Sequence, residues 1–155
     1  MKKIFTCTVL LAAAALTALA QKPNFSGEWS LNNDKSNLGL MPPPQSMTMK
    51  IDHKDPALTA TQTMIGGPQG DQTSTLKFTT DGKESTNDMM GNPAKTVAKW
   101  DGDTLVVNVS LEVQGSEIKL TQKYSLASDG KTLTNNSHIA LPQGEFDMVY
   151  VMDKK

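Results

Sequence analysis

The stretch "TLVVNVSLEVQGSEIKLTQKYSL", residues 104–126, carries the clearest structural signal in the chain. Its first half places an aliphatic side chain at every second position: Leu105, Val107, Val109, Leu111 and Val113. After Gln114-Gly115-Ser116 the second half alternates again, through Ile118, Leu120, Gln122, Tyr124 and Leu126. Alternation with a period of two predicts half-buried β-strands, and the short glycine-containing connection predicts that they form a hairpin.

The same alternation recurs through the rest of residues 21–155, and no stretch shows sustained helical periodicity. About nine or ten strands are expected, over residues 28–31, 46–52, 58–64, 74–79, 84–88, 96–100, 105–113, 118–126, 133–141 and 146–152. Turn-forming residues separate most of them by hairpin-length connections. We therefore expect an all-β fold, an antiparallel up-and-down β-barrel of about 8–10 strands, because closure removes exposed sheet edges. A β-sandwich is the alternative.

Two segments are expected to lack regular structure. Three consecutive prolines in "SNLGLMPPPQ", residues 36–45, favour an extended, polyproline-like path. This segment either covers an opening or is a plain crossover loop. The glycine-rich "IGGPQGDQ", residues 65–72, predicts a turn.

The N-terminus has the pattern of a secretory signal peptide. Lys2 and Lys3 precede an apolar run that ends in the small-residue motif Ala18-Leu19-Ala20. We expect cleavage after residue 20, export to the periplasm or the extracellular medium, and a single domain over residues 21–155; an uncleaved anchor is the alternative. The only cysteine, Cys7, lies within this segment and comes too early for lipidation, so the exported domain has no disulfide and no thiol.

The charge composition excludes several classes of function. All 15 basic residues are lysines, the chain has no arginine, and the formal net charge is −1. A mildly acidic chain without a basic run is a poor nucleic-acid binder. It also lacks the guanidinium groups that bind carboxylates or phosphates through two hydrogen bonds.

Both ends of the predicted domain resemble those of a known superfamily. Phe25-x-Gly27-x-Trp29-x-Leu31 opens the first strand, and the last strand contains Val149-Tyr150. This is similar to the lipocalin and fatty-acid-binding-protein (calycin) superfamily, and also to small exported bacterial proteins with an "FSGxWxLN…KS" opening and a "PPP" loop. The resemblance implies a ligand-carrying barrel in which Trp29 fills the closed end and Gly27 lets the chain bend beneath it.

The chain departs from the superfamily where an arginine is expected. In lipocalins an arginine packs over the tryptophan, and in fatty-acid-binding proteins an arginine of the final strand binds the ligand carboxylate. Here Met148 stands at the second of these places, and only Lys154 or Lys155 could cover Trp29. The resemblance therefore supports the barrel, and it does not support a ligand bound through its carboxylate.

Strand alternation predicts which side chains face the interior. If Met148 points inward, an apolar wall with a polar patch forms from these candidate ligand-binding residues: Gln122, Tyr124, Asn135, Ser137, Met148 and Tyr150. We expect a small, partly apolar molecule, hydrophobic or amphipathic, to bind there. The alternative is a structural or protein-interaction domain with a filled core, which presents an exposed face such as Val106, Val149 and Val151, together with the loop of residues 36–45, to a partner.

Nothing in the sequence points to catalysis, a cofactor or a resident metal. His53 in "DHKDP" is expected to be exposed, and His138 is expected to face solvent because it alternates with the inward residues. No nucleophile or phosphate-binding motif accompanies them. Met47, Met49 and His53, or the pair Met89-Met90, could in principle supply copper ligands, but neither group provides three at a fixed spacing. We therefore expect a binding protein and no enzyme.

Overall fold

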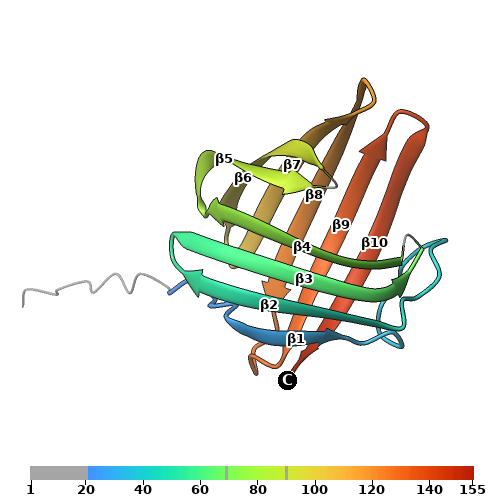
Figure 1. Ribbon diagram of the computed structural model, residues 1–155. Coiled ribbons are helices and arrows are strands. Elements are labelled where there is room, and N and C mark those ends of the chain that lie inside the picture. Colours follow the sequence, from blue (N-terminus) through green and yellow to red (C-terminus); the bar gives the residue numbers. More distant parts are fainter. Residues whose placement is uncertain (1–20, 69, 90) are drawn as a thin grey trace, which may run out of the picture.

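The computed structural model describes residues 21–68, 70–89 and 91–155, so the predicted signal peptide of residues 1–20 lies outside the described residues. Ten antiparallel strands follow one another, and all connections but the one between β1 and β2 are of hairpin length (Figure 1). They are β1 (Gly27–Leu31), β2 (Ser46–Lys54), β3 (Ala57–Gly67), β4 (Gly70–Thr79), β5 (Asp81–Met89), β6 (Asn92–Asp101), β7 (Thr104–Val113), β8 (Ser116–Leu126), β9 (Thr132–Leu141) and β10 (Gly144–Lys154). In the described part of the chain, no helix is long and apolar enough to cross a membrane.

The strands form one sheet that curls into a nearly closed barrel. Their order is β4-β3-β2-β1-β10-β9-β8-β7-β6-β5, and the first strand joins the last by pairing Trp29 with Lys154 and Leu31 with Met152. In every other neighbouring pair, the two strands follow one another directly along the chain. The predicted antiparallel up-and-down barrel is therefore confirmed over the alternative of a sandwich.

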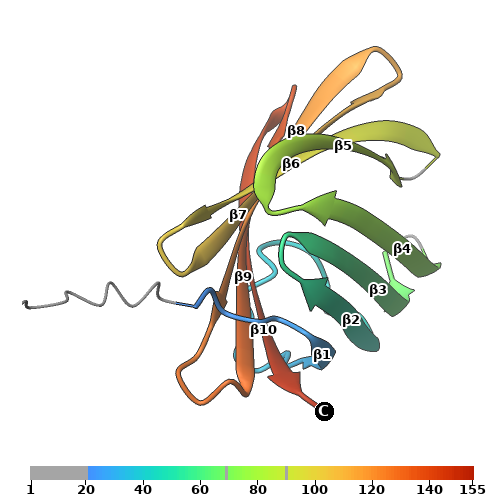
Figure 2. The same cartoon turned by 90° about the vertical axis from the view of Figure 1, so that its left-hand side faces the viewer.

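The barrel is not joined between β4 and β5, which stand at the two ends of the strand order. A side chain connects them, because the backbone N–H of Lys77 donates to Oδ1 of Asn87 over 2.7 Å. Figure 2, seen from the side, shows the ribbons of β4 and β5 diverging from the turn that joins them.

The hairpin of β3 and β4 extends further than the sequence predicts. The expected turn over residues 65–72 is mostly strand, since β3 continues to Gly67 and β4 begins at Gly70. Here the side chains are polar on both faces, which hides the alternation. Hydroxyl pairs hold the two strands, with 3.0 Å between Thr61 and Thr75 and 3.2 Å between Thr63 and Thr73.

The hydrophobic core fills one end of the barrel. Trp29 is fully buried there, and its Nε1–H donates to the carbonyl oxygen of Phe25 over 3.0 Å. Side chains from several strands pack around this pair: Ile51, Leu58, Phe78, Leu105, Leu133 and Met152. This end is closed by side chains, as in a tapered barrel.

The connection between β1 and β2, residues 32–45, is called here the proline-rich loop. It is irregular apart from a two-bond bridge, in which the backbone N–H groups of Asn37 and Val149 donate to each other's carbonyl oxygens over 2.8 and 2.7 Å. Pro44 is buried, whereas Leu40 is 96% exposed. The loop thus covers part of the end opposite Trp29 and leaves several apolar side chains in solvent, Leu40 most of all.

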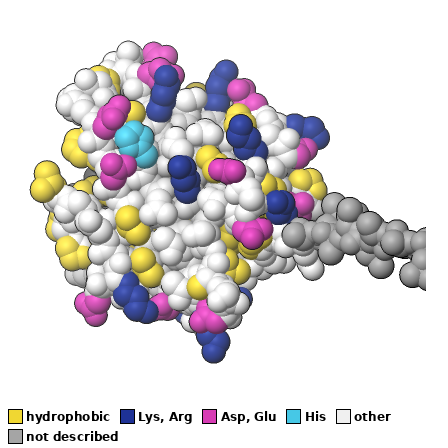
Figure 3. All heavy atoms as spheres, turned by 180° about the vertical axis from the view of Figure 1, so that it is seen from behind, with side chains coloured by type: hydrophobic (Ala, Val, Ile, Leu, Met, Phe, Trp, Pro, Cys, Tyr) yellow, Lys and Arg dark blue, Asp and Glu magenta, His cyan; other side chains and the backbone are white. Residues whose placement is uncertain are grey.

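The outer surface carries both signs of charge. Figure 3 shows lysines and acidic residues interspersed on the face seen from behind, without a basic stripe. The valines of the alternative interaction face, Val106, Val149 and Val151, are half-buried.

Candidate ligand-binding cavity

The six candidate ligand-binding residues come together on one wall of the barrel. Strand register places them in two adjacent rows across β8, β9 and β10: Gln122, Ser137 and Met148 in one row, and Tyr124, Asn135 and Tyr150 in the next. All six line a cavity of about 160 Å³, the inner pocket. They gather because alternate residues of a strand face the same side and the register is free of bulges here.

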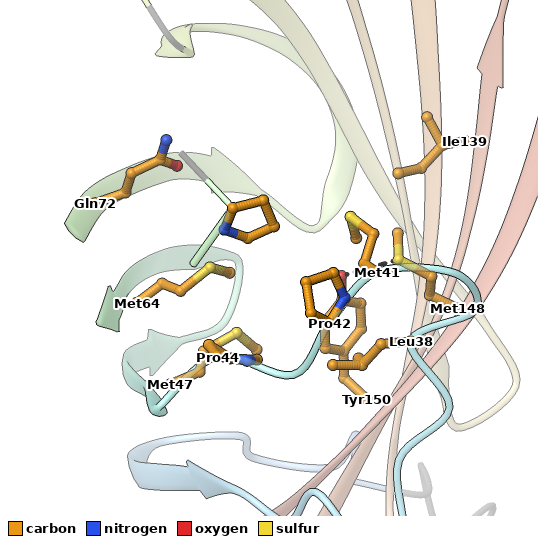
Figure 4. A pocket seen from close by; sticks show the side chains of 11 residues that line it. Leu38, Met41, Pro42, Pro44, Met47, Met64, Gln72, Ile139, Met148 and Tyr150 are labelled. Atoms are coloured by element: carbon orange, nitrogen blue, oxygen red, sulfur yellow. Dashed lines mark hydrogen bonds between the residues drawn. The ribbon is translucent and has the colours of Figure 1, made fainter. Parts of the chain in front are cut away.

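A larger hollow adjoins the inner pocket. This outer pocket has a volume of about 370 Å³ and is lined by the proline-rich loop, by β2 to β4 and by β9 and β10. In Figure 4, Leu38, Met41 and Pro42 lie between the ends of β2 to β4 and the wall of β10. Ile139, Met148 and Tyr150 line both pockets, so the two hollows adjoin.

The polar groups of the inner pocket are only partly paired. Ser137 Oγ donates to Asn135 Oδ1 over 3.2 Å, and the Tyr150 hydroxyl donates to the sulfur of Met148 over 3.3 Å (Figure 4). Oε1 of Gln122 is buried and has no hydrogen-bond partner among the described residues. A thioether is a weak acceptor and a buried unpaired amide oxygen is costly, so this wall has hydrogen-bonding capacity to spare.

The cavity is electrically neutral. Among the described residues that line the two pockets there is no lysine, histidine, aspartate or glutamate, and the chain has no arginine. Burial raises the pKa of the Tyr124 hydroxyl, with a further contribution from Tyr150, and burial alone raises the pKa of Tyr150. Both phenols therefore stay uncharged at neutral pH and can donate hydrogen bonds.

The sequence interpretation missed the opposite wall. Gln62 on β3 and Ser74 on β4 also line the inner pocket and are paired across the two strands. The alternation of Leu58 and Ala60 along β3, if continued, would place Gln62 on the inward face. The sequence therefore contained a signal for this residue. No periodic pattern in the sequence indicates that the proline-rich loop lines the outer pocket.

The prediction that His53 is exposed is wrong. β2 continues through Lys54, so His53 shares the inward face of Met49 and Ile51 and is only 3% exposed. The charged neighbours on either side suggested solvent, but they occupy the outward positions. The ring stacks on Phe25, with 5.8 Å between centroids, and on Trp100, with 6.0 Å.

Hydrogen bonds fix the orientation of His53 at the closed end. The backbone N–H of Phe25 donates to Nδ1 over 3.3 Å, so Nδ1 carries no proton and Nε2 does. Nε2 lies 3.6 Å from Oδ1 of Asp55, which also accepts from Thr80 and, over 3.3 Å, from Trp100. This cluster anchors the segment before β1, and it touches the cavity wall through Phe25, whose ring centroid lies 6.4 Å from that of Tyr124.

His138 faces outward, as its alternation with the inward residues predicts. Its Nδ1 lies 2.8 Å from Oδ1 of Asp147, across the β9–β10 hairpin. Phe146 is in phase with Met148 and Tyr150 along β10, but it is 44% exposed because it lies near the hairpin end of the strand. Within the described residues, no group of three or more histidine, cysteine, aspartate or glutamate side chains is placed to hold a metal ion. Met90 lies outside the described residues.

No protein-family model matches the chain, and no curated protein matches it in sequence. Solved structures do match in fold. A secretory abundant heat soluble protein from Ramazzottius varieornatus is 14% identical with a TM-score of 0.60, over 84% of this chain and 94% of that one. Zebrafish ileal bile acid-binding protein complexed with cholic acid is 20% identical with a TM-score of 0.56, over 84% and 98%.

The fluorescent protein UnaG is a third match, 18% identical with a TM-score of 0.54, covering 84% of this chain and 97% of that one. At these identities the likeness concerns the fold, and it extends over nearly the whole length of each matched chain. The resemblance suggested by Gly27 and Trp29 is therefore confirmed in the architecture: the chain has the calycin barrel fold of these proteins.

Proposed function

We propose that this protein binds a small, largely apolar molecule inside the barrel and acts without catalysis. The observation that carries the proposal is the pair of adjoining pockets, about 370 and 160 Å³, which share Ile139, Met148 and Tyr150. Ligand sites in proteins are hollows of roughly this size, mostly apolar and with a few convergent polar groups. The two rows across β8 to β10 supply such polar groups.

The likeness to the zebrafish protein supports this proposal, since that barrel is described in complex with cholic acid. The alternative of a filled core has less support, because side chains fill only the end around Trp29. We also propose that the protein is exported after cleavage behind Ala20, on the signal-like pattern of residues 1–20. Sequencing the N-terminus of protein from the extracytoplasmic fraction should give Gln21 first.

The binding proposal is tested with Nile red, an uncharged fluorescent probe. We expect saturable binding at one site, with the blue-shifted emission of a dye in an apolar surrounding. Ile139→Trp, which fills the wall common to both pockets, should abolish this binding. Asn136→Trp, on the outward face of the same strand, is the matched control and should leave binding unchanged.

Circular dichroism must show that both variants keep the β-sheet spectrum of the parent. Binding of Nile red that is weak, unsaturable or equal in the parent and Ile139→Trp would place the dye on the surface and contradict a barrel site. Native mass spectrometry of protein purified from its own host adds a second observation, because a co-purifying mass identifies an occupant.

A further inference from the structure

The polar end of the cavity contains the side-chain amide of Gln122. Gln122 lies in the inner pocket between Leu120 and Tyr124, and its buried Oε1 has no partner among the described residues. In the same row Ser137 is already engaged with Asn135, so it does not turn to the glutamine. The amide oxygen of Gln122 is therefore a buried acceptor in this wall that needs a donor.

The surroundings of Gln122 argue against a charged ligand group. The lysines of the same strand, Lys119 and Lys123, alternate with the inward residues and are exposed on the outer face. Placing a carboxylate in a cavity without a cation costs several kcal/mol in desolvation, which neutral donors offset only in part. An uncharged group avoids that cost.

A hydroxyl group fits the available partners best. It donates and accepts at once, as do the amide of Gln122 and the hydroxyl of Tyr150, whose present acceptor is the weak sulfur of Met148. The side-chain amide of Gln122 can accept a hydrogen bond from a hydroxyl through its oxygen or donate one through its nitrogen. A single ligand hydroxyl is therefore enough to pair the free amide oxygen of this wall. The apolar remainder of a ligand would then extend into the outer pocket beneath Leu38 and Pro42.

From these contacts we infer that the ligand is an uncharged amphipathic molecule, of the class of long-chain or ring alcohols, whose hydroxyl binds Gln122. The inference rests on the proposed function, and it adds the chemical class and the residue that selects it. It separates this barrel from one built to bind a carboxylate, since the selecting group is a neutral amide.

The test compares two probes that differ only in the polar group, decan-1-ol and decanoate, at pH 8 where the acid is ionised. Isothermal titration calorimetry should show decan-1-ol binding at least about tenfold more tightly, as expected when an ion must be desolvated without a counter-charge. Gln122→Leu should weaken decan-1-ol by about threefold to tenfold, the effect of losing one neutral hydrogen bond.

Gln143→Leu, the same chemical change in the exposed β9–β10 turn, is the matched control and should alter neither affinity. Decanoate binding as tightly as decan-1-ol would overturn the inference, as would full affinity for decan-1-ol in Gln122→Leu. If neither decyl probe binds but Nile red does, the inference fails and the binding function stands. If Nile red also fails to bind, both fail together.

Discussion

The ammonium group of Lys154 lies over Trp29, 5.3 Å from the centroid of the indole ring. The two residues are direct partners in the ladder that joins β10 to β1. Gly27 makes room for this contact, because a Cβ atom there would lie 2.9 Å from Cε of Lys154. A lysine thus covers the tryptophan at the place where the superfamily resemblance implies an arginine.

This arrangement predicts that a side chain at position 27 lowers the stability of the protein in two ways, through backbone strain and through a clash with Lys154. Its φ of +143° is a conformation that residues with a side chain rarely adopt, so Gly27→Ala should lower the free energy of unfolding by roughly 1–3 kcal/mol. Lys154→Ala alone should lower it by about 0.5–1 kcal/mol through loss of the cation–π contact, and Lys154→Arg should preserve stability. In Gly27→Ala/Lys154→Ala the steric part is relieved but the backbone strain remains. Denaturant unfolding of the four variants measures this, and a neutral Gly27→Ala would contradict it.

A second prediction concerns the amide of Phe25. His53→Phe keeps a ring between Phe25 and Trp100 but removes the acceptor at Nδ1, so the buried Phe25 N–H is left unpaired. We expect a loss of about 1–3 kcal/mol in the free energy of unfolding, together with faster hydrogen exchange at this amide. His138→Phe, at the outward-facing histidine, is the control. Unchanged exchange at Phe25 in His53→Phe would show that the bond to Nδ1 contributes nothing.

A third prediction follows from the two tyrosines, the only ones in the chain. Burial raises the pKa of both hydroxyls in the folded protein, whereas the unfolded chain ionises near the ordinary value of about 10. Their contribution to stability is therefore complete below pH 10 and decreases as the pH rises beyond it. Absorbance at 295 nm should show less phenolate in the folded protein at pH 10.5 than in the unfolded chain at the same pH. A full tyrosine titration at that pH without unfolding would rule out the buried positions.

The contribution of Asp55 to stability has the opposite pH dependence, because it is lost at acid pH. Hydrogen bonds from the hydroxyl of Thr80 and the indole N–H of Trp100, with the ring of His53 close by, lower the pKa of its carboxyl below the ordinary value. A lowered pKa adds stability above the unfolded pKa, near pH 4, and this stability is lost as the pH falls through the folded value. Asp55→Asn should therefore flatten the decline of melting temperature between pH 5 and pH 3. Asp52→Asn, at an exposed position of β2, should keep the slope of the parent protein.

The strength of alternation decided how much the sequence could predict. On β7 to β10 aliphatic and polar residues alternate cleanly, so the inward set that includes Gln122 and Tyr150 could be read directly. On β3 and β4 both faces carry threonine, serine and glutamine, and Gln62 passed unnoticed. His53 was misplaced because charged neighbours outweighed the alternation with Ile51. The proline-rich loop has no period, so its contact with the cavity depends on tertiary structure alone.

The opening between β4 and β5 has a consequence for how copies of the protein behave together. A barrel that is not joined keeps two sheet edges, and bare edges favour the pairing of one chain with another. Residues 70–75 at the start of β4 are exposed and lack large apolar side chains, and β5 carries Lys83, Glu84 and Asp88 in solvent. Charged and polar edges of this kind disfavour pairing between chains, so these residues protect a sheet that stays unclosed.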